Sequence, residues 1–194
     1  MRKAPITFWL TFALTAISLL GFHSSAIAQQ PILQSGTVNL SEWDPMEDGA
    51  LGLNGDWAFF WNELVAPETI STRITNAPTI PVPGGWNTLT TSDGIQPTAY
   101  GYGTYALRVT GLKKFAPDKP LAMVLPPIAS TFKAWWVTGP AKSDAYLLSE
   151  KGVLDPDNPV PQWAPLLTKL PSTHYNEAYL VIQVANQHFW LGGI

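Results

Sequence analysis

The sharpest polar pair in the sequence is Asn186 and His188, at the end of a strand-like run over 179–185. Side chains two positions apart in an extended strand point to the same face, so both could reach one hydroxyl group or anion at the rim of a sheet. The alternative is a structural role, in which the pair hydrogen-bonds to a neighbouring loop. We predict ligand contact for both residues and leave the structural alternative open.

Aromatic residues near turns supply a second kind of chemistry. The flat face of a Trp or Tyr can stack on the apolar C–H face of a sugar, while nearby polar groups bind its hydroxyls. Aromatic residues at loop or strand-end positions are Trp86, Tyr100, Tyr102, Trp163 and Trp190. We predict ligand contact for Trp86, Tyr102 and Trp190. Core or rim packing is the competing interpretation, and Trp86, which follows a Pro-Gly-Gly turn, could equally be a plug at one end of a sandwich.

Other chemistries lack the residues that they need. The chain has no Cys, which removes disulfides, thiolate metal sites and cysteine nucleophiles. His174 and His188 are not in metal-ligand spacing, and Asp155, Asp157 and Asn158 fit a solvated turn as well as a calcium loop, so no metal or cofactor is predicted. Nucleophile-elbow and dinucleotide-binding motifs are missing, and nothing marks a glycosidase carboxylate pair. We therefore predict that the chain is not an enzyme.

Composition and charge define the class of the protein. The 194 residues have a formal net charge of -3, and the 11 basic residues are scattered singly, so nucleic acid is excluded as a partner. Hydrophobic residues make up 46% of the chain, enough for one globular core. With 18 Pro, 15 Gly, 9 Trp and only 13% charged residues, the composition favours strands and turns over long surface helices.

The first 28 residues predict a secretory signal peptide. Met1-Arg2-Lys3 is basic, the run over 6–22 is apolar and free of charge, and Ala26-Ile27-Ala28 is a small-x-small cleavage site. An uncleaved anchor helix is the alternative, because the apolar run lies at the lower edge of membrane-spanning length. Residues 29–194 are then one exported domain on the periplasmic or extracellular side of a membrane.

Alternating apolar residues predict the elements that position these side chains. Strands are expected over 57–61, 104–110, 121–125, 131–137 and 179–185. Trp57, Phe59 and Trp61 point one way while Ala58 and Phe60 point the other, so both faces of the first of these strands should be covered. Short strands with internal tryptophans predict an all-β sandwich of the jelly-roll type.

Turn signals complete this prediction. Asn54-Gly55 between apolar runs indicates a hairpin. In the strand over 104–110 the odd-numbered residues should face the core and the even-numbered residues the solvent. The Pro-rich stretch over 149–172 is expected to be a long loop, and helical periodicity is limited to a few residues around 63–65.

Four motifs, in order, carry a resemblance to a known family. They are Val38-Asn39-Leu40-Ser41-Glu42-Trp43 leading to Leu53-Asn54-Gly55-Asp56-Trp57-Ala58-Phe59-Phe60-Trp61, then Val82-Pro83-Gly84-Gly85-Trp86-Asn87, Gly101-Tyr102-Gly103-Thr104-Tyr105-Ala106-Leu107, and Val184-Ala185-Asn186-Gln187-His188 with Gly192-Gly193. Their order resembles the extracellular jelly-roll sensor domain of bacterial seven-transmembrane receptors with diverse intracellular signalling modules. That domain is similar to the galactose-binding-like sugar-binding domain of the β-galactosidase superfamily of glycoside hydrolases.

The resemblance implies non-catalytic sensing of a small ligand, such as a saccharide, with the membrane half of a receptor as the partner. The family domain continues with at least one further strand beyond the Gly-Gly pair, so residues 29–194 are expected to lack the last strand or strands. Thr138-Gly139 also stands where the family tends to have Asn-Gly. Two alternatives stay open: an accessory sugar-binding domain of a glycoside hydrolase, and an envelope module that binds another protein.

Overall fold

The structure, a computed structural model, describes residues 31–115, 120–139, 144–162 and 166–194. The predicted signal peptide and Trp163 lie outside these residues. In the described chain the strands are β1 (Thr37–Asn39), β2 (Gly55–Trp61), β3 (Thr79–Val82), β4 (Gly101–Thr110), β5 (Ala122–Leu125), β6 (Thr131–Thr138), β7 (Asp144–Lys151), β8 (Leu166–Lys169) and β9 (Glu177–Asn186). No helix in these segments is long and apolar enough to span a membrane.

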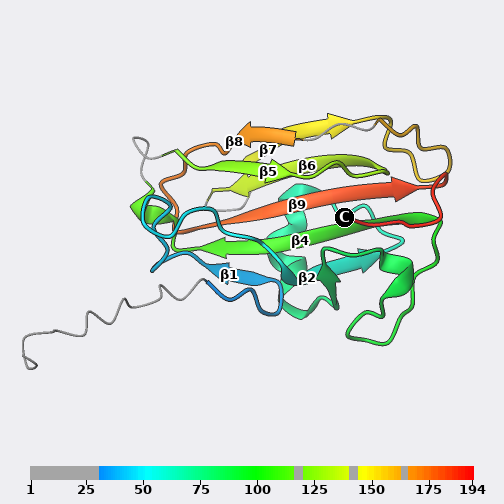
Figure 1. Cartoon of the computed structure of the whole chain (residues 1–194), viewed down its shortest axis with the longest axis horizontal. Helices are drawn as coiled ribbons and strands as arrows, with labels where there is room; N and C mark the ends of the chain where they lie inside the picture. The colour runs from blue at the N-terminus through cyan, green and yellow to red at the C-terminus, as the bar shows by residue number, and fades with distance from the viewer. Residues whose placement is uncertain (1–30, 116–119, 140–143, 163–165) are drawn as a thin grey trace, which may run out of the picture.

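The strands form two layers. The main sheet has the order β3-β2-β4-β9-β6-β7, with β1 parallel to the last residues of β4, and β5 and β8 form a second, antiparallel sheet. β4 and β9 pair over ten residues and lie side by side at the centre of the main sheet (Figure 1). The prediction of an all-β, jelly-roll-type sandwich is confirmed.

One core fills the space between the two layers. Trp57 and Phe59 of β2 project into this core together with Leu180 and Ile182 of β9, and Met123 of β5 meets them from the second layer. Alternation along each strand explains which residues are buried here, because every second side chain of a strand points to the same face. The predicted facing of Trp57, Phe59 and the inward residues of β9 is confirmed.

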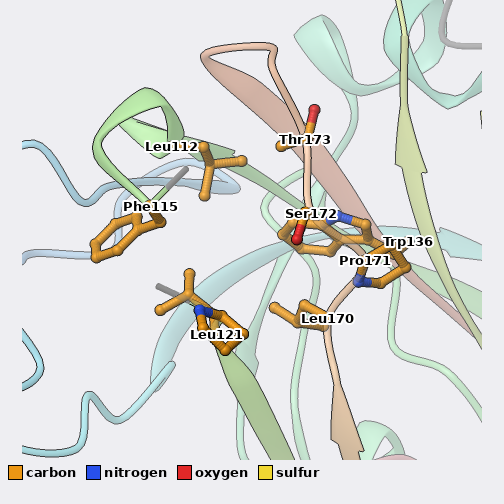
Figure 2. Close-up of a pocket in the computed structure, with 9 residues that line it drawn as sticks. Leu112, Phe115, Leu121, Trp136, Leu170, Pro171, Ser172 and Thr173 are labelled. Atoms are coloured by element: carbon orange, nitrogen blue, oxygen red, sulfur yellow. The ribbon is translucent and has the colours of Figure 1, made fainter. Parts of the chain in front are cut away.

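This core has a small hollow at its edge, beside the short 3₁₀ turn Leu112–Lys114 (η4) (Figure 2). Leu121 and Leu170 line it with Trp136, whose indole N–H has no hydrogen-bond partner among the described residues. The hollow measures about 20 Å³, which is room for about one water molecule. It is therefore too small to be a site for a sugar.

A second core covers the other face of the main sheet. A helical segment over 67–76, made of η1 (Pro67–Thr69), α2 (Ile70–Arg73) and η2 (Ile74–Asn76), packs Ile70 and Ile74 against Ala106 and Val181. The prediction that the even-numbered residues of β4 face solvent is therefore wrong for Ala106 and for the fully buried Thr104. It overlooked this segment, in which Ile70 and Ile74 are at helical spacing but the stretch is too short for two apolar positions to establish a period.

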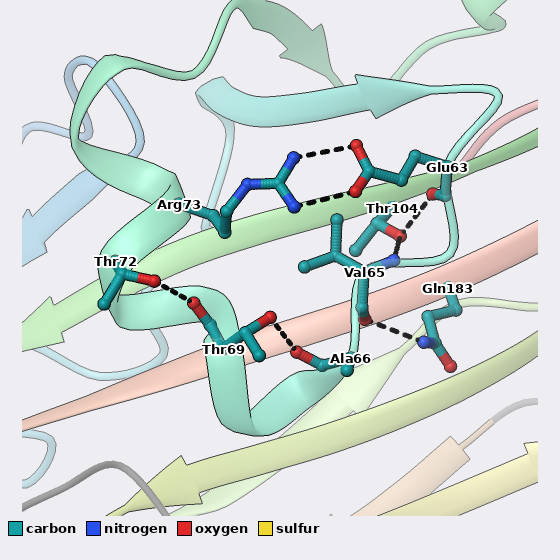
Figure 3. A network of polar contacts seen from close by, with 8 residues as sticks. All are labelled: Glu63, Val65, Ala66, Thr69, Thr72, Arg73, Thr104 and Gln183. Atoms are coloured by element: carbon teal, nitrogen blue, oxygen red, sulfur yellow. Dashed lines mark hydrogen bonds and ion pairs between the residues drawn. The ribbon is translucent and has the colours of Figure 1, made fainter.

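Two buried polar side chains hold the loop that leads into this helical segment (Figure 3). Thr104 Oγ1 donates to the Glu63 carbonyl at 2.7 Å and accepts from the Val65 N–H at 3.0 Å. Gln183 Nε2 donates to the Val65 carbonyl at 2.9 Å. Buried backbone groups need partners, so these bonds attach the loop to β4 and β9 and account for the burial of two polar residues in an apolar face.

Two further predictions differ from the structure. Asn54-Gly55 is not a hairpin, because residues 51–54 are not in a strand and β2, which starts at Gly55, pairs with β3 and β4. The stretch over 149–172 is not all loop, since it contains the end of β7 and the whole of β8. β7 lies at the edge of the sheet, where half-exposed side chains weaken the period-two signal.

Candidate functional site

The residues predicted from sequence lie mostly at one end of the main sheet, where β4 begins and β9 ends. Gly101 and Asn186 are register partners at this end. The loop after β3, the loop over 155–160 and the C-terminal residues 187–194 come together here. We call this end of the molecule the rim and define it by Tyr100, His188, Phe189 and Trp190.

Asn186 is buried, with 2% of its surface exposed, and its side-chain amide makes four hydrogen bonds. Nδ2 donates to the carbonyls of Ala99 and Phe189, each at 2.8 Å. Oδ1 accepts from the backbone N–H of Phe189 at 3.1 Å and of His188 at 3.4 Å. The amide therefore holds the C-terminal turn against the loop before β4 and has no surface left for a ligand in this conformation.

His188 is exposed and makes a different contact. β9 ends at Asn186, so the strand alternation from which a shared face was predicted does not reach His188. The imidazole Nε2 lies 2.7 Å from the Pro159 carbonyl, and the neighbouring Gln187 Nε2 donates to the Pro156 carbonyl at 3.2 Å. Asn186 and His188 therefore make hydrogen bonds to neighbouring loops, as the structural alternative expected. Ligand contact through the rest of the His188 imidazole stays a prediction.

Trp86 closes the end of the first core. It is completely buried, packs edge-on against Trp61 with ring centroids 5.1 Å apart, and donates from Nε1 to the Ala99 carbonyl at 3.3 Å. The C-terminal segment runs antiparallel over it, with the Trp86 N–H donating to the Gly192 carbonyl at 2.8 Å. A side chain on Gly192 would overlap the indole. Trp86 therefore plugs this end of the sandwich, as the alternative interpretation expected, and its ring offers no surface to a ligand in this conformation.

Trp190 and Tyr100 supply the exposed aromatic faces of the rim, with 77% and 52% of their surfaces exposed. The backbone around Trp190 is tethered: Asn87 Nδ2 donates to the Trp190 carbonyl at 3.0 Å, and Asn87 Oδ1 accepts from the Gly192 N–H at 3.2 Å. The turn therefore presents a flat, exposed indole on a backbone that is held by hydrogen bonds, and such a face can stack on an apolar surface.

The remaining candidates lie apart from Trp190. Tyr102 is half-buried and follows Gly101, so strand alternation places it on the opposite face of the sheet from Asn186. Asp155 Oδ1 accepts from the backbone N–H of Asp157 and Asn158 at 2.8 and 3.1 Å, which is an Asx turn. Among the described residues no group of three or more His, Asp or Glu side chains is arranged to hold a metal ion.

Sequence reasoning missed two residues of this end. Phe189 is 36% exposed beside Trp190, and Asn87 anchors the C-terminal turn through both ends of its amide. The position of Asn87 in a Gly-rich turn was a usable signal, because Asn side chains commonly bond to nearby backbone groups in such turns. Its actual partners are more than 100 residues away in sequence, and no local pattern identifies them.

No protein-family model matches the chain, and no curated protein matches it in sequence. Among solved structures it is similar to a β-glucuronidase from Faecalibacterium prausnitzii, with 19% identity and a TM-score of 0.46 over 70% of this chain and 20% of that one. A β-glucuronidase from Ruminococcus gnavus is 14% identical, with a TM-score of 0.43 over 70% of this chain and 21% of that one. A GH2 β-galacturonidase from Eisenbergiella tayi is 12% identical, with a TM-score of 0.40 over 70% of this chain and 19% of that one. The chain spans about a fifth of the length of these enzymes. A similarity of this degree carries no conclusion about its activity.

Proposed function

We propose that this chain is an exported, non-catalytic domain that binds a saccharide at the rim. The exposed indole of Trp190 carries this proposal. A large aromatic face that is 77% exposed gains by being covered, and the apolar face of a sugar ring is a matching surface. Because Asn87 and Asn186 already hold the backbone of the turn, ligand binding would lose little conformational entropy there.

Polar groups beside the indole provide the hydrogen bonds that a saccharide needs. His188 is exposed, and with Nε2 held by Pro159 its Nδ1 is left for a ligand hydroxyl. Tyr100 adds a phenol hydroxyl that can donate and accept. Aromatic, imidazole and phenol groups suit binding, and they do not form the nucleophile and base arrangement that bond cleavage requires.

The experiment is a glycan-array screen followed by calorimetric titration of the saccharides that bind. Trp190→Ala should weaken binding at least tenfold, which corresponds to about 1.4 kcal/mol. Tyr175→Ala is the matched control, because Tyr175 is an exposed aromatic residue near the other end of β9 and its loss should leave the affinity unchanged. An array without any bound saccharide, or equal affinities for the two variants, would contradict the proposal.

The proposed setting is the outer side of a membrane, with the membrane half of a receptor as partner. The motif resemblance supports this setting, and the reading frame beyond codon 194 tests it. Seven downstream hydrophobic segments would support the receptor. A downstream catalytic barrel would instead support the accessory domain of a glycoside hydrolase, with the same saccharide chemistry at the rim.

A further inference from the structure

A second, larger hollow lies on the helix-covered face of the main sheet. This cleft measures about 330 Å³, within the usual size range of small-molecule sites. It is lined by Ser35, Thr37, Ser71, Ile74, Thr75, Arg108 and Tyr179. Arg108 and Tyr179 are register partners on β4 and β9. Arg108 is seven residues along β4 from Gly101, so at the usual rise per residue the cleft lies about 23 Å from the rim.

Four of the residues that line the cleft carry a hydroxyl group. They are Ser35, just before β1, Thr37, the first residue of β1, and Ser71 and Thr75 in the helical segment. None of these hydroxyls has a hydrogen-bond partner in the described chain. Each one can both donate and accept a hydrogen bond, which is the pattern that a ligand with several hydroxyls requires.

The charge in the cleft is already balanced. Arg108 Nε donates to Glu177 Oε2 at 2.9 Å, and the side chains of this ion pair are 45% and 24% exposed. A guanidinium that keeps its carboxylate partner can still donate to a neutral oxygen, but the nearby carboxylate repels an anion. The lining also includes Ile74 and Tyr179, both of which are buried. These features favour a neutral ligand.

We propose that this cleft is a second binding site, selective for a neutral polyol of about monosaccharide size. The polyol is either a free sugar or the terminal residue of a glycan, since both present the same hydroxyls. The site shares no residue with the rim and lies at the other end of β4. It is therefore independent of the function proposed for Trp190.

The test is a titration followed by amide chemical shifts, with glucose, galactose, mannose and N-acetylglucosamine as neutral probes. In the Trp190→Ala variant, in which the rim site is removed, shifts should appear at Thr37, Ser71 and Thr75 while Gly192 stays unmoved. The double variant Ser71→Ala/Thr75→Val removes two hydroxyls with little change of shape and should weaken binding at least tenfold. Thr90→Val, an exposed threonine outside the cleft, is the matched control. Trp190→Ala should bind these sugars at the cleft as the wild type does.

Additional ligands and one further variant complete this experiment. Disaccharides ending in the bound sugar tell a glycan terminus from a free sugar, and either result supports the site. Thr75→Val alone changes an exposed hydroxyl and should weaken binding about threefold if the double variant does not fold. Three results would overturn the proposal: no shift at the cleft with any neutral sugar, unchanged affinity in the folded hydroxyl variants, or tighter binding of glucuronate or inorganic phosphate than of the neutral sugars.

Discussion

Replacing Asn186 by Ala tests the account of how the rim is built. The change removes the donors to two carbonyls and the acceptor for two backbone N–H groups, one of them at a weak 3.4 Å. A net value of about 1 kcal/mol for each of the three good bonds gives an upper figure of about 3 kcal/mol. The Ala99 carbonyl keeps its bond from Trp86, and groups of the exposed turn can bond to water. We therefore expect a loss of about 2 to 3 kcal/mol in the free energy of unfolding.

Urea denaturation measures this loss directly, and thermal unfolding should show a fall in Tm of about 5 to 10 °C for a domain of this size. Asn186→Asp keeps the acceptor oxygen but replaces the donor Nδ2 by a second carboxylate oxygen that faces two carbonyls, so it should be no more stable than the Ala variant. Gln187→Ala, in an exposed neighbour with a single 3.2 Å bond, should change stability by less than about 0.5 kcal/mol. If Asn186→Ala matched Gln187→Ala, or if the Asp variant were as stable as the wild type, the account of this amide would be wrong.

Two further predictions concern a glycine and a buried phenol. Gly111 has a φ of 79°, and a Cβ there would overlap the Ser41 backbone, so Gly111→Ala should lower the free energy of unfolding by more than about 2 kcal/mol. Gly94 is the control, because it has a φ of 89° but open space around it. Gly94→Ala should lower the free energy of unfolding by only about 1 kcal/mol in the same denaturation assay. Burial raises the pKa of Tyr105 from its ordinary value of 10.0, and its hydroxyl touches the Ile194 backbone without hydrogen-bond geometry. Above about pH 10 the folded state keeps a proton that the unfolded chain releases, so the free energy of unfolding should fall as the pH rises further. Tyr105→Phe should reduce that fall in a series of unfolding curves measured at different pH values. At pH 7 the variant should differ from the wild type by no more than about 0.5 kcal/mol. A Tyr105→Phe protein with the same alkaline profile as the wild type, or equal losses for the two glycine variants, would contradict these expectations.

Three strands of the main sheet could be predicted from sequence because each is a short run rich in apolar, aromatic and β-branched residues. Alternation within 57–61, 131–137 and 179–185 places their side chains correctly, since the period of a strand is a local property of the backbone. The edge strand β7 and the short helical segment over 67–76 could not be predicted in this way. Their burial depends on which distant surface they cover, and short or half-exposed elements have weak periodicity.

The candidate site shows the same division. Sequence identified the aromatic and amide residues at the turns, and the structure brings Trp86, Asn186, His188 and Trp190 to one end of the sheet. The structure also distinguishes these residues by exposure, since Trp86 and Asn186 are buried while Trp190 is 77% exposed. The backbone of the turn that carries Trp190 is held by a bond from Asn87, a residue 103 positions away, which no local pattern in the sequence could identify.

The cleft on the other face had no signal in the sequence. Ser35, Ser71 and Arg108 are ordinary surface residues when read singly, and they meet only because β1 pairs with the end of β4 and the helical segment packs beside them. The sequence by itself determined an all-β fold, because residue types and period-two alternation act between near neighbours along the chain. The tertiary structure alone decided which aromatic residue is buried as a plug, which is exposed and which hydroxyl-bearing residues line the cleft, because these properties depend on residues that are distant in sequence.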